Sequence, residues 1–469
     1  MELTLHPILK TYRNMAKNRN LDRDKLDFGN GKIGALFRAI FFPTLVGMIF
    51  NSVLTLVDGM FVGHGVGANG IAAVNIVAPL FLLATGIGLM FGIGTSVVAS
   101  IRLSEDNVKA ARIIMTQAFG AGALMVGVIG AAALLMPRET VYLLGCSAEL
   151  ESNAIGYMVP LIPGIFFLVI QCIGMMLIRL DGSPRYAMWT QVIPASVNIV
   201  LDYIMIFHMG MGVAGAAGAT SISCLLGGLM VLAYFIWFSD KLKFYRLKLS
   251  VTSLLLTLRN IGYMAKIGFA TFLTEGAMAV MMFTGNYAFM KMLGENGVAA
   301  FSIACYLFPV VFSIANAVAQ SAQPIISFNY GADRPDRISR ALKIALCTAV
   351  VCGTVVTAGL WAGASPIVGA FLSSDEPAYA LATHGLPIFA TCAIFFAVNI
   401  TFIGYYQSIE AALRSIFYTM LRGIVFIIPA FLVLPGLFGS VGLWLAIPTA
   451  EFLTLTVISG HYLVRHGRP

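Results

Sequence analysis

Acidic side chains lie inside several apolar segments of this sequence, where an ionised carboxylate is costly. Glu275, Asp202 and Asp58 are the clearest examples. A carboxylate at the centre of a bilayer costs about 2.5–3.5 kcal/mol by insertion scales. Each of these residues therefore needs an explanation, and cation binding is the chemistry that we consider first.

Four polar residues of the first half of the chain are expected to lie at a similar depth. Asn198 precedes Asp202 by four residues and therefore shares its helical face, while Asp58 and Thr220 belong to other apolar segments. Two carboxylates with amide and hydroxyl oxygens could bind Na⁺. Crowded and withdrawn from water, the same carboxylates could instead carry a proton. The alternative is that Asp58 and Asp202 are solvated, or cap helix ends near the surface.

Glu275 is the acid that we place deepest. It follows Lys266 by nine residues, or about 13 Å at the helical rise per residue. Met278 and Met282 follow it within two helical turns. An acid among methionine side chains suits an amphiphilic organic cation, although a methionine stripe can equally be core packing. Glu451 is a further embedded acid to which the sequence assigns no role.

The composition explains why these acids are expensive. Of 469 residues, 59% are hydrophobic and only 11% are charged, whereas a soluble domain carries about 25% charged residues. Lipid is the solvent that suits such a surface. The seven cysteines show no metal-ligand or disulfide spacing, and no Walker A sequence or nucleophile–base constellation occurs. We therefore expect neither an enzyme nor a cofactor.

Twelve apolar runs are long enough to cross a bilayer, which takes about 20 residues. They are 36–58, 72–100, 112–136, 155–178, 186–208, 213–238, 258–286, 297–320, 341–363, 383–407, 413–435 and 440–464. Of 29 Lys and Arg residues, 25 fall in the termini and in alternate connections, Arg179 among them. Basic residues stay on the cytoplasmic side. Both termini are thus predicted in the cytoplasm, and the positive charge orients the chain without implying nucleic acid as a partner.

The two halves of the chain form a repeat at one constant offset of 227 residues. Gly67-Ala68-Asn69-Gly70 corresponds to Gly294-Glu295-Asn296-Gly297. Six spans in each half give a parallel repeat, typical of transporters whose lobes rock about a central cleft; a duplicated channel or membrane enzyme is the alternative. The predicted divisions are a cytoplasmic tail (1–34), an N-lobe (35–240), a linker (241–257), a C-lobe (258–464) and a C-terminal tail (465–469).

Several local sequences together resemble one family. They are Pro43 followed by Leu56-Val57-Asp58 and Val62-Gly63; Asn198-Ile-Val-Leu-Asp202; Thr220; Phe272-Leu-Thr-Glu275; and Gln323-Pro-Ile-Ile-Ser-Phe-Asn-Tyr-Gly331. From Ala35 to Arg465 the chain resembles the MATE (multidrug and toxic compound extrusion) family, in particular its bacterial MepA-like branch. The resemblance implies an all-α membrane fold of twelve transmembrane helices in two six-helix lobes.

The resemblance also implies roles for individual residues. Asp58, Asn198, Asp202 and Thr220 match the family's cation-coupling site, and Glu275 matches an acid implicated in coupling or cargo binding. Asp58 and Asp202 would be metal ligands only if the coupling ion is Na⁺. In this reading Met278 and Met282 contact the cargo beside Glu275, and Pro43 is a hinge in the first helix.

The implied activity is secondary antiport: a monomer in the lipid bilayer of a bacterial inner membrane exports small amphiphilic organic cations in exchange for H⁺ or Na⁺. Two departures from the family pattern concern the site. Met175 and Met176 stand where relatives often have an Asn pair, and Asn399 and Thr401 stand where some have an acid.

The alternative within the same superfamily is a flippase for lipid-linked oligosaccharides. Such a protein should present a basic, hydrophilic cleft between its lobes. The deep charges of this sequence are acidic instead. Arg422 and Lys266 are placed toward the cytoplasmic ends of their helices, where their long side chains can reach the interface.

Overall fold

The computed structural model describes residues 26–248 and 250–466. Within them the chain is helical nearly throughout. The helices are α2 (Ile33–Val66), α3 (Ala68–Ser104), α4 (Val108–Leu135), α5 (Pro137–Leu143), α6 (Glu151–Leu180), α7 (Pro184–Asp202), α8 (Gly212–Ala233), α9 (Val251–Gly331), α10 (Pro335–Ala362), α11 (Ala364–Gly369), α12 (Pro377–Ala390), α13 (Cys392–Ser408), α14 (Ala412–Met420), α15 (Ile427–Phe438) and α16 (Ser440–His466). Short π-helical segments extend α7, α8 and α14. Of the predicted tails, residues 1–25 and 467–469 lie outside the described residues.

The predicted twelve-helix membrane fold is confirmed. In the described part of the chain, 11 helices are long and apolar enough to span a membrane. One of them, the 81-residue α9, contains Gly294 with φ 65° and ψ −154°, which is not a helical conformation. Glycine reaches positive φ without a steric penalty, so the chain reverses there and α9 supplies two spans.

The backbone repeats the predicted internal symmetry. Gly67, the partner of Gly294 at the 227-residue offset, also has a positive φ, 85°, between α2 and α3. The same offset relates Asp106 to Asp333, both with left-handed φ angles. The turns that separate equivalent spans are therefore alike in the two halves.

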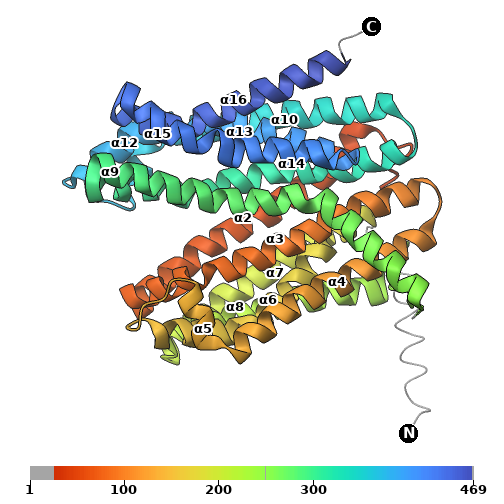
Figure 1. Ribbon diagram of the computed structural model, residues 1–469, viewed down its shortest axis with the longest axis horizontal. Helices are drawn as coiled ribbons and strands as arrows, with labels where there is room; N and C mark the ends of the chain where they lie inside the picture. The colour runs from red at the N-terminus through yellow and green to blue at the C-terminus, as the bar shows by residue number, and fades with distance from the viewer. Residues whose placement is uncertain (1–25, 249, 467–469) are drawn as a thin grey trace.

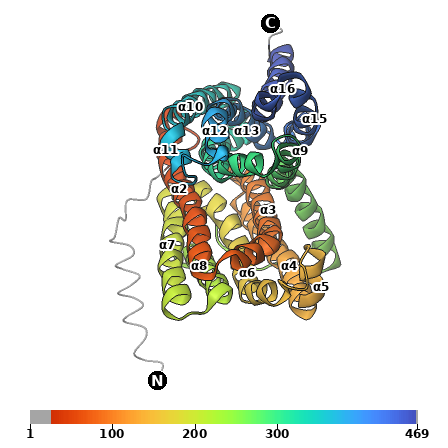
Figure 2. The same ribbon diagram turned by 90° about the vertical axis from the view of Figure 1, so that its left-hand side faces the viewer.

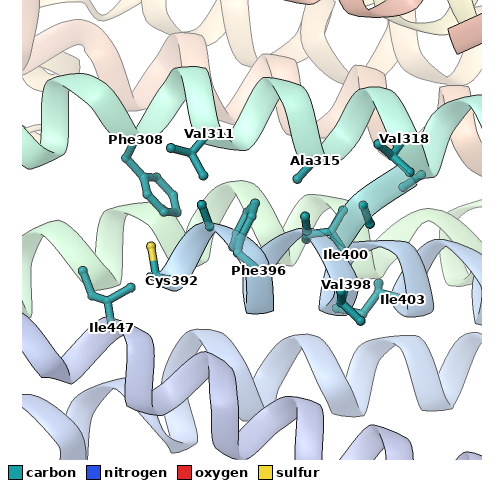
Figure 3. Close-up of a cluster of buried hydrophobic side chains, with 14 of the residues drawn as sticks. Phe308, Val311, Ala315, Val318, Cys392, Phe396, Val398, Ile400, Ile403 and Ile447 are labelled. Atoms are coloured by element: carbon teal, nitrogen blue, oxygen red, sulfur yellow. The ribbon is translucent and has the colours of Figure 1, made fainter. Parts of the chain in front are cut away.

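Two bundles stand against each other (Figures 1 and 2). The lower bundle contains α3–α8 and the upper one α10–α16, while α9 begins beside the lower bundle and then runs along the upper one. Each has its own cluster of buried apolar side chains. Figure 3 shows part of the upper core, where the Phe308 and Phe396 rings lie 5.3 Å apart between α9 and α13. We call the lower bundle the N-lobe and the upper one the C-lobe.

The first helix of each half begins against the opposite lobe. Phe37 and Ile40 of α2 are buried in the C-lobe core, and their partners at the 227-residue offset, Met264 and Ile267 of α9, are buried in the N-lobe core. Figure 1 shows α2 running from the upper bundle to the lower one. The predicted lobe boundaries near residues 35 and 258 did not anticipate this reciprocal crossing.

The lobes meet closely near the end of the molecule where α2 begins and α16 ends. A Cβ atom at Gly268 would overlap the backbone oxygen of Met90. Close by, Ser96 Oγ of α3 donates to Gln323 Oε1 of α9 over 3.0 Å. Ser96 and Gln323 are 227 residues apart and thus occupy equivalent positions in the two halves. Small and polar residues of α3 and α9 therefore bring the lobes together at this end.

Candidate cation-binding site

Asp58 and Asp202 meet where the second half of α2 packs on α7. Asp202, the last residue of α7, has no exposed surface, and Asp58 is half-buried. Their carboxyl groups lie close enough to interact with each other. Because two ionised carboxylates at close range repel each other, such a pair favours a bound proton or another small cation. The alternative placement of Asp202 as a solvated helix cap does not fit its burial.

Asn198 and Thr220 complete the group that the sequence placed at one depth. With its amide oriented so that each donor meets an acceptor, Asn198 donates from Nδ2 to Asp202 Oδ2 over 3.1 Å. Its carbonyl oxygen then accepts from the backbone N–H of Thr220, also over 3.1 Å. The structure thus brings Asp58, Asn198, Asp202 and Thr220 together from α2, α7 and α8.

Two further features of this site are electrostatic. Oδ1 of Asp58 and Oδ1 of Asp202 are buried and receive no hydrogen bond from a protein donor among the described residues. None of the described ion pairs includes either acid. A pair of carboxyl groups without a basic partner, in a largely apolar setting, is an arrangement that a small cation can neutralise.

Tyr157 of α6 is a site residue that the sequence reasoning missed. Its side chain is 6% exposed, and it lies close enough to Asp58 and Asp202 to interact electrostatically with both. A single tyrosine within an apolar segment does not by itself indicate a binding site. Tyr157 is identified only by the packing of α6 on its neighbours. Met175 and Met176 are buried in the N-lobe core and contribute no oxygen atom.

Glu275 of α9 lies apart from this group. It is 8% exposed and interacts electrostatically with Cys172 of α6, in the opposite lobe. Of the two methionines predicted beside it, Met278 is partly buried against the C-lobe core and Met282 is 41% exposed. Glu275 therefore lies between the lobes, with one of its two predicted companions turned partly toward the core.

A small cavity lies between α3, α9 and α13, and its lining includes Thr274, which precedes Glu275 in the sequence. Its lining is rich in amide and hydroxyl side chains and includes Thr271, Thr274, Asn316, Gln320, Gln323 and Gln407. Gln407 Nε2 donates to Thr271 Oγ1 over 2.9 Å. These groups offer hydrogen bonds without a net charge.

Arg422 is not at an accessible helix end, so its predicted placement is wrong. Its side chain is 6% exposed, and Nη2 lies 2.7 Å from Glu451 Oε1. Asn399 Nδ2 donates to Glu451 Oε2 over 2.8 Å, and the guanidinium lies 4.5 Å from the centre of the Phe396 ring. The embedded acid Glu451 thus has a basic partner inside the C-lobe. Lys266, in contrast, is exposed as predicted.

Comparison with known proteins gives one consistent result. A family model described as MatE matches residues 43–204 and 267–432. The chain is similar to the multidrug export protein MepA of Staphylococcus saprophyticus, 26% identical over 426 residues that cover 90% of this chain and 92% of that protein. It is 23% identical to MepA of a Staphylococcus aureus strain, over 90% of this chain and 92% of that one.

The fold is shared with solved transporters. A MOP superfamily transporter from Pyrococcus furiosus, described as having a binding pocket of reversed polarity, superposes with a TM-score of 0.83, 22% identity and coverage of 93% of this chain and 96% of that one. A multidrug resistance transporter of the same superfamily in an outward-facing conformation gives a TM-score of 0.83 at 22% identity, over 91% and 94% of the two chains.

Proposed function

This chain belongs to the MATE family of multidrug and toxic compound extrusion transporters, and we propose that it is a secondary antiporter that exports small organic cations in exchange for H⁺ or Na⁺. The observation that carries the proposal is the pair of neighbouring acids, Asp58 and Asp202, which has no basic partner in an ion pair among the described residues. Its staphylococcal relatives are named as multidrug export proteins, which supports both the direction of transport and the kind of cargo.

Two features of the site favour H⁺ over Na⁺. A proton on one acid relieves the repulsion between Asp58 and Asp202 without any further ligand, and the amide nitrogen of Asn198, rather than its oxygen, faces Asp202. Na⁺ coordination would need several oxygen ligands turned toward one point, and Met175 and Met176 supply none. In the Na⁺ case, Asp58 and Asp202 would be the charged ligands.

Coupling requires that the ion bind one conformation of the lobes more tightly than the other. Helix α2 can transmit that preference, because Phe37 and Ile40 are held in the C-lobe core while Asp58 packs on α7 of the N-lobe. Pro43 lies between these two anchors and removes a backbone hydrogen bond of the helix. We assign Pro43 as the hinge at which α2 bends when the lobes rock.

For the cargo, we assign Glu275 as the anionic contact, with Met278 and Met282 as adaptable apolar contacts. Glu275 is buried between the lobes, and Cys172 is the neighbour with which it interacts across them. A carboxylate among sulfur and aromatic groups attracts a desolvated organic cation. Replacing Glu275 by Gln should weaken export of monovalent cations.

The flippase alternative would need a basic, hydrophilic cleft. Among the described residues, Arg179 is the buried base at the contact of the lobes, whereas Arg422 is paired inside the C-lobe. One guanidinium does not make a basic cleft for a polyanionic lipid head group. We therefore keep export of organic cations as the proposed activity.

The location we propose is the inner membrane of a bacterium, with both termini in the cytoplasm and the chain acting as a monomer. The asymmetric placement of 25 of 29 Lys and Arg residues supports this orientation.

The test uses purified protein in liposomes that contain a fluorescent organic cation, with a pH gradient and a Na⁺ gradient imposed separately. We expect transport of the dye with the pH gradient, and none in protein-free liposomes or with the Asp202→Asn variant. Equal transport with neither gradient would contradict antiport, and transport with the Na⁺ gradient alone would identify Na⁺ as the coupling ion.

A further inference from the structure

Arg179 occupies a place that its expected role does not explain. The sequence puts it with the basic residues of a cytoplasmic connection, but its side chain is only 1% exposed, close to the end of α6. Burial of a guanidinium without a charged partner is strongly unfavourable. A basic residue that only orients the chain in the membrane would stay in contact with water.

The hydrogen bonds of Arg179 use one of its three nitrogen atoms. Nη1 donates to Gln320 Oε1 over 2.7 Å and to Met176 Sδ over 3.4 Å. Nε and Nη2 are buried and have no hydrogen-bond partner in the described part of the chain. No described carboxylate forms an ion pair with this side chain.

The contacts of Arg422 show which partner Arg179 lacks. There, Nε and Nη2 both donate to Glu451 Oε1, over 2.9 and 2.7 Å. These two nitrogen atoms form the planar edge of the guanidinium that matches a carboxylate group. At Arg179 the same two nitrogen atoms have no protein acceptor. The two buried arginines therefore differ in whether this chain supplies the carboxylate.

We propose that the Nε and Nη2 edge of Arg179 binds the carboxylate group of a small molecule that enters between the lobes. The hydrogen bond from Arg179 to Gln320 joins α6 of the N-lobe to α9 of the C-lobe. Gln320 also lines the amide-rich cavity, together with Asn316 and Gln323. When the lobes separate at this end, the guanidinium becomes accessible beside a wall of neutral hydrogen-bonding groups.

The carboxylate has two sources with the same chemistry. It is either a free organic acid or an acidic group carried by a cargo molecule that also bears a cationic group. For the second source, the same α6 helix places Cys172, the neighbour of Glu275, seven residues before Arg179, which is about 10 Å along the helix. A molecule with both charges could then contact Glu275 and Arg179 together.

The experiment measures thermal unfolding of the purified full-length protein in a chloride buffer at constant ionic strength. Three probes are added: benzoate, its neutral isostere benzamide, and 4-(aminomethyl)benzoate, which carries both charges. We expect benzoate, but not benzamide, to raise the unfolding temperature in a saturable way. Tighter binding of 4-(aminomethyl)benzoate than of benzoate, by about 10-fold or more, would assign the site to cargo; equal binding would assign it to free acids.

Two variants at neighbouring positions provide the control. Arg179→Gln should abolish the benzoate shift, whereas Arg185→Gln, at an exposed arginine after the end of α6, should leave it unchanged. A benzoate shift that persists in Arg179→Gln would overturn the proposal. Equal shifts with benzamide and benzoate would also overturn it. So would competition by chloride for the same site as strong as that by benzoate. These two outcomes need only the unmodified protein.

This binding test uses no gradient. It can therefore succeed where antiport fails, or fail where antiport succeeds.

Discussion

The two lobes each bury acidic side chains, but they neutralise them in different ways. In the N-lobe, Asp58 and Asp202 lie beside each other, and no described ion pair includes them. In the C-lobe, Glu451 receives two hydrogen bonds from the guanidinium of Arg422 and one from Asn399. The C-lobe acid therefore has a basic partner within the lobe, whereas no described ion pair supplies one to the N-lobe acids.

This difference shows that the repeat preserved the scaffold and not the chemistry. At the 227-residue offset, Asp58 corresponds to Gly285 and Asp202 to Pro429. A buried ion pair is at most weakly stabilising, but removing one partner is costly. The C-lobe cluster of Asn399, Arg422 and Glu451 is thus suited to holding α13, α14 and α16 in one arrangement. The N-lobe cluster of Asp58, Asn198, Asp202 and Thr220 is suited to changing its charge during a transport cycle.

The largest expected effect comes from Asp202→Asn. Asparagine keeps the size of the side chain and its hydrogen bonds but cannot release a proton. We expect gradient-driven export in proteoliposomes to fall on the order of 100-fold, with an unfolding temperature close to that of the unmodified protein. Export above half of the original rate would remove Asp202 from the coupling site.

The C-lobe cluster should respond in stability rather than in coupling. Arg422→Met leaves Glu451 buried without its partner, and we expect a loss of about 3–5 kcal/mol of stability, seen as a lower unfolding temperature in detergent. The double variant Arg422→Met with Glu451→Gln should recover most of that loss and still export cargo. If the double variant folds normally but cannot couple export to the gradient, the two lobes are not different in the way proposed.

A smaller effect is expected from Asn198→Ala, which removes the donor to Asp202 Oδ2. The loss of one hydrogen bond to a buried charged group is worth about 1.5–3 kcal/mol. We expect export to decrease roughly 10-fold. The concentration of the coupling cation that gives the half-maximal rate should also change. Asn260→Ala is the matched control, because that amide donates to Gln117 Oε1 of α4 and belongs to neither the acid pair nor the cavity.

The smallest effect is expected from Tyr157→Phe. The phenol interacts with both acids from a distance, and no described hydrogen bond joins it to either one. We expect export to fall by a factor of about two to five, since exposed or long-range interactions are worth under 1 kcal/mol. A loss as large as that of Asp202→Asn would make Tyr157 a direct participant in cation transfer.

The sequence alone predicted the membrane class, the twelve spans and the two-lobe repeat, because hydropathy and loop charge depend on one segment at a time. It also placed Asp58, Asn198, Asp202 and Thr220 together, since depth along each helix can be counted. The reciprocal crossing of α2 and α9 was not predicted. Where each helix end packs depends on tilt, which hydropathy does not encode.

The pairing of Arg422 with Glu451 and the burial of Arg179 were also missed. Both depend on the rotation of a helix about its axis, which decides whether a basic side chain faces its neighbours or reaches the interface. One signal was available for the first pair: an embedded base and an embedded acid lie 29 residues apart, on consecutive spans of opposite direction.

The central claim is that cargo and a small cation exchange at the N-lobe acid pair. The most direct measurement adds an organic cation to the purified protein in weakly buffered detergent solution and follows the release of H⁺ with a pH indicator, and of ²²Na⁺ in parallel. We expect the unmodified protein and the variant with both Arg422→Met and Glu451→Gln to release a cation, and the variant with both Asp58→Asn and Asp202→Asn to bind cargo without releasing one. The same release from the Asp58→Asn and Asp202→Asn variant would contradict the account.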